Sequence, residues 1–169
     1  MSAESRIGCI GLGVMGEPIC ANLLRKSGCS VLGYDLRPEP LARLASEGLQ
    51  ACASAEEVAR EAAIIFLSLP GGPELAAISE RLLGVMGKGA VLVDLSTAPV
   101  DLTRELAGKF EARGVAYADA PVARTRFAAE RGELCVMVGA DAATFARIEP
   151  IFAALRATSC TAAASAPAR

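Results

Sequence analysis

The feature that most constrains the fold is a glycine-rich turn between a predicted strand and a predicted helix. Residues 11–16 read GLGVMG and follow the apolar segment RIGCI at residues 6–10, which is typical of a buried strand. Residues 17–26 then carry apolar side chains at the spacing of one helix face. A chain with sixteen glycines can contain this glycine spacing by chance. The strand before it and the helix after it nevertheless predict a βα unit whose turn can receive a ligand.

Each glycine of this turn has a separate physical role in the predicted site. One allows the tight turn, the next lets a diphosphate approach the backbone, and the third lets the helix pack closely on the strand. The helix N-terminus offers N–H groups and a positive dipole end to an anion, so no Lys or Arg is required. The residues expected to bind a dinucleotide are Gly11, Leu12, Gly13, Val14, Met15 and Gly16. The alternative is a glycine-rich turn that binds no ligand.

A carboxylate stands at the end of the next predicted strand, SVLGY at residues 30–34. Asp35 can accept hydrogen bonds from both hydroxyls of an adenosine ribose, which favours NAD as the cofactor. A 2′-phosphate would meet the negative charge of Asp35, but Arg37 could reach such a phosphate, so NADP is possible as well. The alternative is an ordinary acidic turn residue before Pro38.

Composition limits the classes of partner. The 169 residues suffice for one domain, and an apolar fraction of 53% supports a hydrophobic core. The net charge of −2 comes without a basic cluster, so a nucleic acid is not an expected partner. No apolar run reaches the length of a membrane span, and the first residues, MSAESR, do not resemble a signal peptide. We therefore expect a cytoplasmic protein with no membrane partner.

Cysteine and histidine usage narrows the chemistry. Six cysteines without a CxxC spacing, several of them within predicted strands or helices, indicate buried reduced thiols rather than a disulfide framework. Histidine is absent, which removes the most common general base and the most common zinc ligand, and we expect no metal site. Acid–base chemistry is left to Lys, Asp, Glu, Tyr or Cys.

Strand and helix patterns alternate along the chain. Strands are predicted at residues 6–10, 30–34, 62–69, 90–95, 115–119 and 134–138. Helices are predicted at residues 17–26, 41–48, after a cap at Ser54, and at 73–86, 99–113 and 141–155, with a helix or loop at 121–131. This order predicts a single α/β domain with a doubly wound, mostly parallel, Rossmann-type sheet over residues 1–156. Residues 157–169 lack large apolar side chains and are expected to form an irregular tail.

Three segments together resemble one enzyme family. They are IGCIGLGVMGEPICANLLRKSG at residues 7–28, DLST at 94–97 and DAPV at 119–122. Over residues 1–155 the chain is similar to the β-hydroxyacid dehydrogenases, which include 3-hydroxyisobutyrate dehydrogenases and tartronate semialdehyde reductases. The resemblance implies an NAD(P)-dependent oxidoreductase. Such an enzyme transfers a hydride between the nicotinamide and a small 3-hydroxy acid or the corresponding semialdehyde.

The resemblance also assigns further site residues. Leu69 and Pro70 match the loop that lies along the cofactor, and Thr97 matches a position near the nicotinamide ribose. The alternative for Leu69 and Pro70 is a strand terminator, and for residues 96–97 it is an N-cap of the following helix. Where the family has Ser-Gly-Gly for the substrate carboxylate, this chain has Ala123, Arg124 and Thr125. Arg124 could pair with a carboxylate, or it could lie on a solvated helix face.

The catalytic lysine of the family has no match in this sequence. In the family it lies on a helix beyond the nucleotide-binding domain, and none of Lys26, Lys88 and Lys109 fits its motif. We therefore assign no catalytic residue and expect a truncated form that is inactive by itself, unless Tyr117 or Asp119 carries the proton. The alternatives are a dinucleotide-binding module without catalysis and a fragment of an imine-type reductase.

Overall fold

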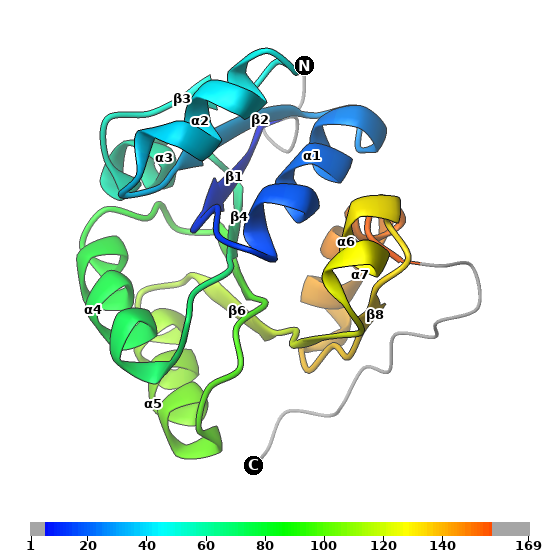
Figure 1. The fold of residues 1–169 in the computed structure, drawn as a ribbon. Helices are drawn as coiled ribbons and strands as arrows, with labels where there is room; N and C mark the ends of the chain where they lie inside the picture. The colour runs from blue at the N-terminus through cyan, green and yellow to red at the C-terminus, as the bar shows by residue number, and fades with distance from the viewer. Residues whose placement is uncertain (1–5, 157–169) are drawn as a thin grey trace.

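The computed structural model describes residues 6–156, which form a six-stranded parallel sheet with helices on both faces (Figure 1). The strands are β1 Arg6–Ile10, β2 Ser30–Tyr34, β3 Gln50–Ala51, β4 Ile64–Leu67, β5 Val91–Asp94 and β6 Ala116–Asp119. The helices are α1 Gly16–Lys26, α2 Pro38–Ala45, α3 Ala55–Glu61, α4 Gly72–Leu83, α5 Val100–Glu111, α6 Arg126–Arg131 and α7 Ala142–Phe152. The expected doubly wound α/β fold is confirmed.

The strand order places a crevice at the centre of the sheet. The order is β3-β2-β1-β4-β5-β6, so the chain extends the sheet first to one side of β1 and then to the other. Ile10 at the end of β1 pairs with Leu67 at the end of β4. The connections that leave these two strand ends run to opposite faces of the sheet, and ligands of such folds bind in the crevice between them.

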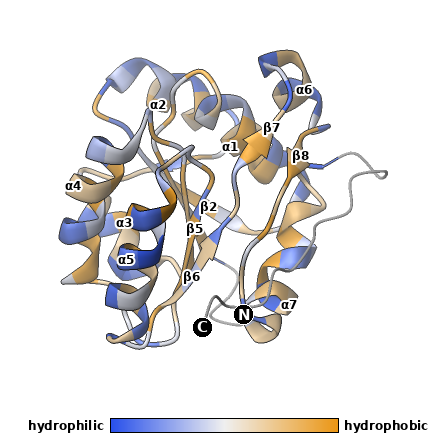
Figure 2. Ribbon diagram, turned by 90° about the horizontal axis from the view of Figure 1, so that it is seen from below, coloured by the Kyte–Doolittle hydropathy of each residue, from blue (hydrophilic) through white to orange (hydrophobic). Residues whose placement is uncertain are grey.

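Alternate residues of the strands divide the core into two halves. Ile7 and Phe66 point toward the layer that contains α1, α6 and α7, and the ring of Phe66 meets that of Phe152 edge-on at 6.0 Å. Ile65 and Leu92 point toward the layer that contains α3, α4 and α5. Figure 2 shows the sheet between these two layers of helices. Both faces of the central strands are thus covered, as their continuous apolar runs predicted.

Two details of the predicted sheet are wrong. Residues 134–138 do not supply its sixth strand, because Cys135–Val136 (β8) pairs antiparallel with Val122–Ala123 (β7) in a separate two-stranded sheet. The sixth strand is β3, two exposed residues that pair with β2. An apolar run shows that a segment is buried but not which strand it pairs with, and two residues are too few to show a period.

Helix α6 is fastened to α1 by side chains. Asn22 is fully buried, and its Nδ2 donates to the carbonyl oxygen of Ala129 at 2.7 Å. Lys26 Nζ donates to the carbonyl oxygen of Arg131 at 3.2 Å. The Arg131 carbonyl belongs to the last turn of α6, where a helix terminus leaves carbonyl groups without an intrahelical partner, whereas the Ala129 carbonyl also accepts from the N–H of Gly132. The segment between β7 and α6 is thereby held beside the first βα unit.

Other expectations concern cysteines, membrane spans and the tail. Cys9, Cys20 and Cys52 are buried thiols, and burial raises the pKa of Cys52 to about 11.

Within residues 6–156, no helix combines the length and the apolar character needed to cross a bilayer. The predicted tail at residues 157–169, with Cys160, lies outside the described residues.

Candidate functional site

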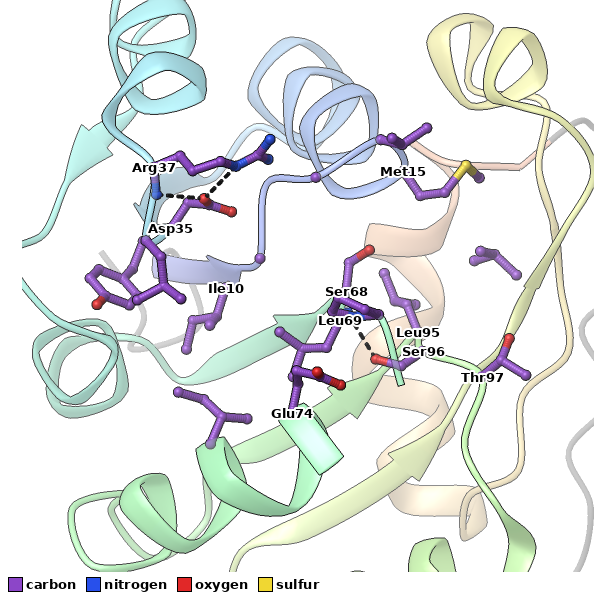
Figure 3. A pocket seen from close by; sticks show the side chains of 18 of the residues that line it. Ile10, Met15, Asp35, Arg37, Ser68, Leu69, Glu74, Leu95, Ser96 and Thr97 are labelled. Carbon is purple, nitrogen blue, oxygen red and sulfur yellow. Dashed lines mark hydrogen bonds and ion pairs between the residues drawn. The ribbon is translucent and has the colours of Figure 1, made fainter. Parts of the chain in front are cut away.

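A cavity of about 890 Å³ opens where the ends of β1, β2, β4 and β5 meet (Figure 3). Its size lies in the range of small-molecule and cofactor sites. Figure 3 shows Asp35 and Arg37 at one end, Thr97 at the other, and Ser68, Leu69 and Ser96 between them. The cavity is lined by Ile10, Gly11, Gly13, Val14, Met15, Tyr34, Asp35, Leu36, Arg37, Ser68, Leu69, Pro70, Glu74, Ala77, Ile78, Arg81, Leu95, Ser96, Thr97, Val122 and Arg124.

The three glycines of the turn meet three different surroundings. Gly11 has φ +85°, and a Cβ there would lie 2.3 Å from the carbonyl oxygen of Ser68. A Cβ at Gly16 would lie 1.9 Å from the carbonyl oxygen of Gly11. At Gly13 the nearest atom to an added Cβ is Arg37 Nη2 at 4.0 Å, so this position faces the open cavity. Gly11 and Gly16 therefore allow close packing, whereas Gly13 leaves room for a ligand against the backbone.

Asp35 fastens the turn and faces the cavity at the same time. The N–H of Leu12 donates to Asp35 Oδ2 at 2.6 Å, and the N–H of Arg37 donates to Oδ1 at 2.8 Å. The Asp35 side chain is 10% exposed, and Arg37 Nε contacts Oδ1 at 3.4 Å. A carboxylate has about four acceptor positions. Asp35 can thus accept one further strong hydrogen bond, and a second if the long Arg37 contact is released.

The N-terminus of α1 ends at the cavity without a side-chain cap. Its N-cap residue is Met15, which lines the cavity and offers no capping hydrogen bond. The helices α2, α4 and α5 lack a side-chain cap as well, whereas Ser54 caps α3, Thr125 caps α6 and Asp141 caps α7. The first turn of an uncapped helix and its dipole favour an anion beside it.

The loop after β4 is tied to the loop after β5. Ser96 Oγ accepts a hydrogen bond from the N–H of Leu69 at 3.0 Å, and both residues line the cavity. The expected alternative, an N-cap at residues 96–97, is wrong because the N-cap of α5 is Pro99. Thr97 is exposed and lines the cavity, as does Pro70. The strand β4 already ends at Leu67, so Pro70 terminates no strand.

The three residues expected to hold a substrate, residues 123–125, lie in three different environments. Arg124 lines the cavity, whereas Ala123 pairs with Cys135 in the small sheet and Thr125 caps α6 through the N–H of Ala128. Arg124 has φ +91°, and among residues 6–156 it is the sole non-glycine residue with a positive φ. This conformation is unfavourable for a side-chain-bearing residue by about 1 to 2 kcal/mol. It falls at the position where the resembling family has glycine.

One face of α4 was missed by sequence reasoning. Glu74, Ala77, Ile78 and Arg81 line the cavity and follow the i, i+3, i+4, i+7 spacing of one helix face. The sequence shows this spacing, but the spacing does not tell whether a helix face lies against a cavity or against the core.

Arg81, at the end of this face, is held by Glu56. Arg81 Nε donates to the Glu56 carboxylate at 2.7 Å, and this hydrogen bond lowers the pKa of Glu56 to about 2. Ser68 was likewise not identified as a cavity residue, whereas the sequence offered Ser96, together with Thr97, as a cofactor contact or an N-cap.

The groups considered for proton transfer lie outside the lining of this cavity. Tyr117 is 7% exposed and donates to Asp94 Oδ2 at 3.0 Å, and burial raises its pKa strongly. Burial also raises the pKa of Asp119, and the negative charge of the neighbouring Asp94 raises it further.

The three lysines also lie elsewhere. Lys26 contacts α6, and Lys109 Nζ pairs with Glu105 Oε1 at 2.6 Å. Lys88 lies against Gly114. All of these residues fall within the described range.

Residues 6–164 match the family described as the NAD binding domain of 6-phosphogluconate dehydrogenase. The chain is 37% identical over 158 residues to 2-(hydroxymethyl)glutarate dehydrogenase from Eubacterium barkeri, a match that covers 92% of this chain and 52% of that protein. The chain thus spans about half the length of the curated relatives that it matches. The range of the family match spans the glycine turn and the ends of β4 and β5.

Solved structures show the same architecture. The 3-hydroxyisobutyrate dehydrogenase from Mycobacterium tuberculosis, solved with L-serine, has a TM-score of 0.85 and 31% identity, with 89% of this chain and 52% of that chain covered. A protein named Psf3, solved with NADP+ and 2-OPP, has a TM-score of 0.85 and 27% identity, with 90% and 55% covered. The resemblance seen in the sequence is therefore confirmed at the level of the nucleotide-binding domain.

Proposed function

The chain belongs to the family of the NAD-binding domain of 6-phosphogluconate dehydrogenase, and on that premise we propose how it holds a nicotinamide dinucleotide. The adenosine ribose lies at Asp35, the diphosphate at Gly13 and the N-terminus of α1, and the nicotinamide half toward Leu69 and Thr97. The observation that carries this proposal is the contrast among the three glycines. Two of them are enclosed by backbone, and the third opens onto the cavity.

The residues of the turn bind by main-chain groups and shape. Gly13 leaves the backbone accessible, Val14 and Met15 line the cavity beside it, and Gly16 lets α1 start close to the strand. Leu12 has a different role, since its side chain is fully buried and its N–H is occupied by Asp35. We therefore assign Leu12 to holding Asp35 in place rather than to contacting the diphosphate.

We further propose that NAD is preferred over NADP. The Asp35 carboxylate keeps acceptor capacity for a ribose hydroxyl and would repel a 2′-phosphate at the same position. Arg37 reduces this discrimination, because its guanidinium lies at the cavity and could turn from Leu12 and Asp35 toward a phosphate. Both cofactors are thus expected to bind, with NADH the tighter.

The reaction we propose for the complete enzyme is oxidation of a 3-hydroxy acid or reduction of its semialdehyde. The bound nicotinamide supplies the hydride acceptor or donor. Arg124 lines the cavity and could pair with the substrate carboxylate. This proposal is supported by the strained backbone conformation of Arg124, since such strain concentrates at functional sites.

We propose that the described residues bind the dinucleotide but do not themselves complete this reaction. Hydride transfer to or from a hydroxyl carbon requires a proton carrier on the substrate oxygen, and a missing carrier typically reduces the rate by about 10²- to 10⁴-fold. Among the described residues, the cavity lining includes neither a lysine nor Tyr117. Its ionisable oxygen groups are the Glu74 carboxylate on α4, to which we assign no proton transfer, and the Asp35 carboxylate and Tyr34 phenol at the adenosine end. A hydroxyl at that end is too remote from the proposed nicotinamide position to serve.

Titration of the full chain with NADH and NADPH, followed by nicotinamide fluorescence, tests the proposal. Gly13→Ala should weaken NADH binding by roughly tenfold or more, because its methyl group enters the space of the diphosphate while the free protein has room for it. Gly87→Ala is the matched control, since nothing lies within 4 Å of an added Cβ there. A folded wild-type chain with no affinity for either reduced cofactor would refute the proposed function.

A further inference from the structure

The fully buried carboxylate of Asp94 is used by neither the proposed cofactor contacts nor the proposed chemistry. It stands at the carboxyl end of β5 and is 0% exposed. Burial raises its pKa, and hydrogen bonds from Ser96 and Tyr117 oppose that rise. A buried carboxylate is expensive unless it is hydrogen-bonded. The partners that satisfy it therefore indicate what it holds in place.

Three hydrogen bonds connect the interior of the α5 layer with the cavity. Tyr117 Oη donates to Asp94 Oδ2 at 3.0 Å, and the N–H of Ser96 donates to Asp94 Oδ1 at 2.9 Å. Ser96 Oγ in turn accepts from the N–H of Leu69 at 3.0 Å. Tyr117 is fixed at the far end, because its ring stacks on Phe110 with the centroids 6.0 Å apart. We name the set Tyr117, Asp94, Ser96 and Leu69 the Asp94 relay.

Sheet register explains why these residues meet. On β5 and β6, Leu92 is the partner of Tyr117, and Asp94 is the partner of Asp119. Side chains alternate along a strand, so Asp94 and Tyr117 point to the same face of the sheet. The long phenol reaches the carboxylate diagonally across the two strands. The contact depends on pairing between segments 23 residues apart.

The relay reaches the cavity through two of its members. Ser96 and Leu69 line the cavity between Thr97 and the end that holds Asp35 and Arg37 (Figure 3). Ser68 is held by its N–H bond to the carbonyl oxygen of Ile10 at 3.0 Å, and Leu69 is held by Ser96. Pro70 has no N–H to add a further tie. Removing the Ser96 hydroxyl would therefore release Leu69 and Pro70 at the nicotinamide end.

We propose that Asp94 and Tyr117 are positioning residues that fix Ser96 and Leu69 beneath the nicotinamide ring of the bound dinucleotide. This inference rests on the proposed function, because it assumes that a dinucleotide occupies the cavity in the stated orientation. It adds residues that touch no ligand themselves and whose effect should be confined to one half of that ligand. A general role in folding would have no such restriction.

Comparison of NADH with ADP-ribose tests the inference, because ADP-ribose has both riboses and the diphosphate but no nicotinamide. Binding of each ligand to the full chain is measured by calorimetry for wild type, Tyr117→Phe and Ser96→Ala. Each variant should weaken NADH binding by about fivefold, the effect of one hydrogen bond, and leave ADP-ribose binding within about twofold of wild type. Tyr117→Phe retains the ring that stacks on Phe110, which keeps the core intact.

Ser79→Ala is the matched control for Ser96→Ala. Ser79 is also fully buried, and its hydroxyl has no partner among the described residues. This variant should change neither affinity. Equal weakening of NADH and ADP-ribose by Tyr117→Phe and Ser96→Ala, or unchanged NADH binding in either variant, would overturn the inference. A wild-type chain that binds neither ligand would overturn the proposed function and the inference with it, whereas binding of ADP-ribose alone would reject only the nicotinamide contacts.

Discussion

Two positions on the cavity have nearly the same φ angle, but one carries no side chain and the other carries a long one. Gly11, where β1 turns toward α1, has φ +85°, and Arg124, before α6, has φ +91°. At Gly11 a side chain is excluded, because a Cβ would lie 2.3 Å from the Ser68 carbonyl oxygen. At Arg124 a long cationic side chain is kept although glycine would suit the backbone better.

Packing determines the residue type at Gly11, whereas Arg124 carries a side chain although its backbone conformation is unfavourable for one. The turn at Gly11 is enclosed by neighbouring backbone, so its geometry allows one residue type. The segment at Arg124 is open to the cavity and tolerates strain of about 1 to 2 kcal/mol. The glycine turn therefore follows the family pattern, whereas the segment at Arg124, which we propose for the substrate, departs from it.

The largest expected effect is at Gly11. Gly11→Ala combines a left-handed backbone with a collision against backbone of the β4 loop, so we expect a loss of roughly 3 kcal/mol of unfolding free energy and loss of NADH binding. Chemical denaturation and NADH titration measure the two effects. Gly48→Ala has φ +104° without any atom within 4 Å and isolates the backbone strain. Equal destabilisation by both variants would show that packing does not determine Gly11.

The next effect is at Asp35. Asp35→Asn keeps the size of the side chain but removes the negative charge, so NADH should bind about tenfold more weakly and the ratio of NADPH to NADH affinity should rise. Fluorescence titration with both cofactors gives this ratio. Glu39→Gln removes an exposed charge from the neighbouring helix α2 and should leave the ratio unchanged. A ratio that stays constant in Asp35→Asn would contradict the proposed ribose contact.

A smaller effect is expected at Thr125, beside Arg124. Thr125→Ala removes the cap of α6, a change of about 0.5 to 1 kcal/mol that lowers Tm by roughly 1 to 4 °C. Ser54→Ala removes the equivalent cap of α3 and is the comparison variant. NADH affinity should not change in either protein, as thermal scans with and without NADH would show. Weaker NADH binding in Thr125→Ala alone would place this segment within the cofactor site.

The smallest effect on stability is expected at Arg124 and has the opposite sign. Arg124→Gly removes the left-handed strain but adds backbone freedom to the unfolded chain, so stability should rise by about 0.5 kcal/mol. Binding of a small carboxylate to the NADH complex, followed by NMR line broadening, should weaken in the same variant. Arg124 Nη1 also donates to the Glu133 carbonyl oxygen at 3.3 Å. A clear loss of stability would mean that this contact, rather than substrate binding, accounts for the arginine.

Much of the fold could be predicted because its signals are local. The bounds of α1, β1 and β2 agree closely with the predicted segments, since period and turn chemistry report directly on the backbone. The pairing of β8 and the existence of β3 could not be predicted, because strand partners are chosen between distant segments. The same limit applies to the cavity face of α4 and to Ser96, whose side chain holds a residue 27 positions away.

By itself the sequence determined the glycine turn, the acidic residue after β2 and the alternation of strands and helices, because each depends on conformational preferences within a few neighbouring residues. The tertiary structure alone decided that Leu12 serves Asp35, that Asp94 reaches Leu69 through Ser96, and that Arg124 occupies a glycine-like conformation. These features arise from sheet register and from the packing of one layer on another, which bring together groups that no local pattern connects.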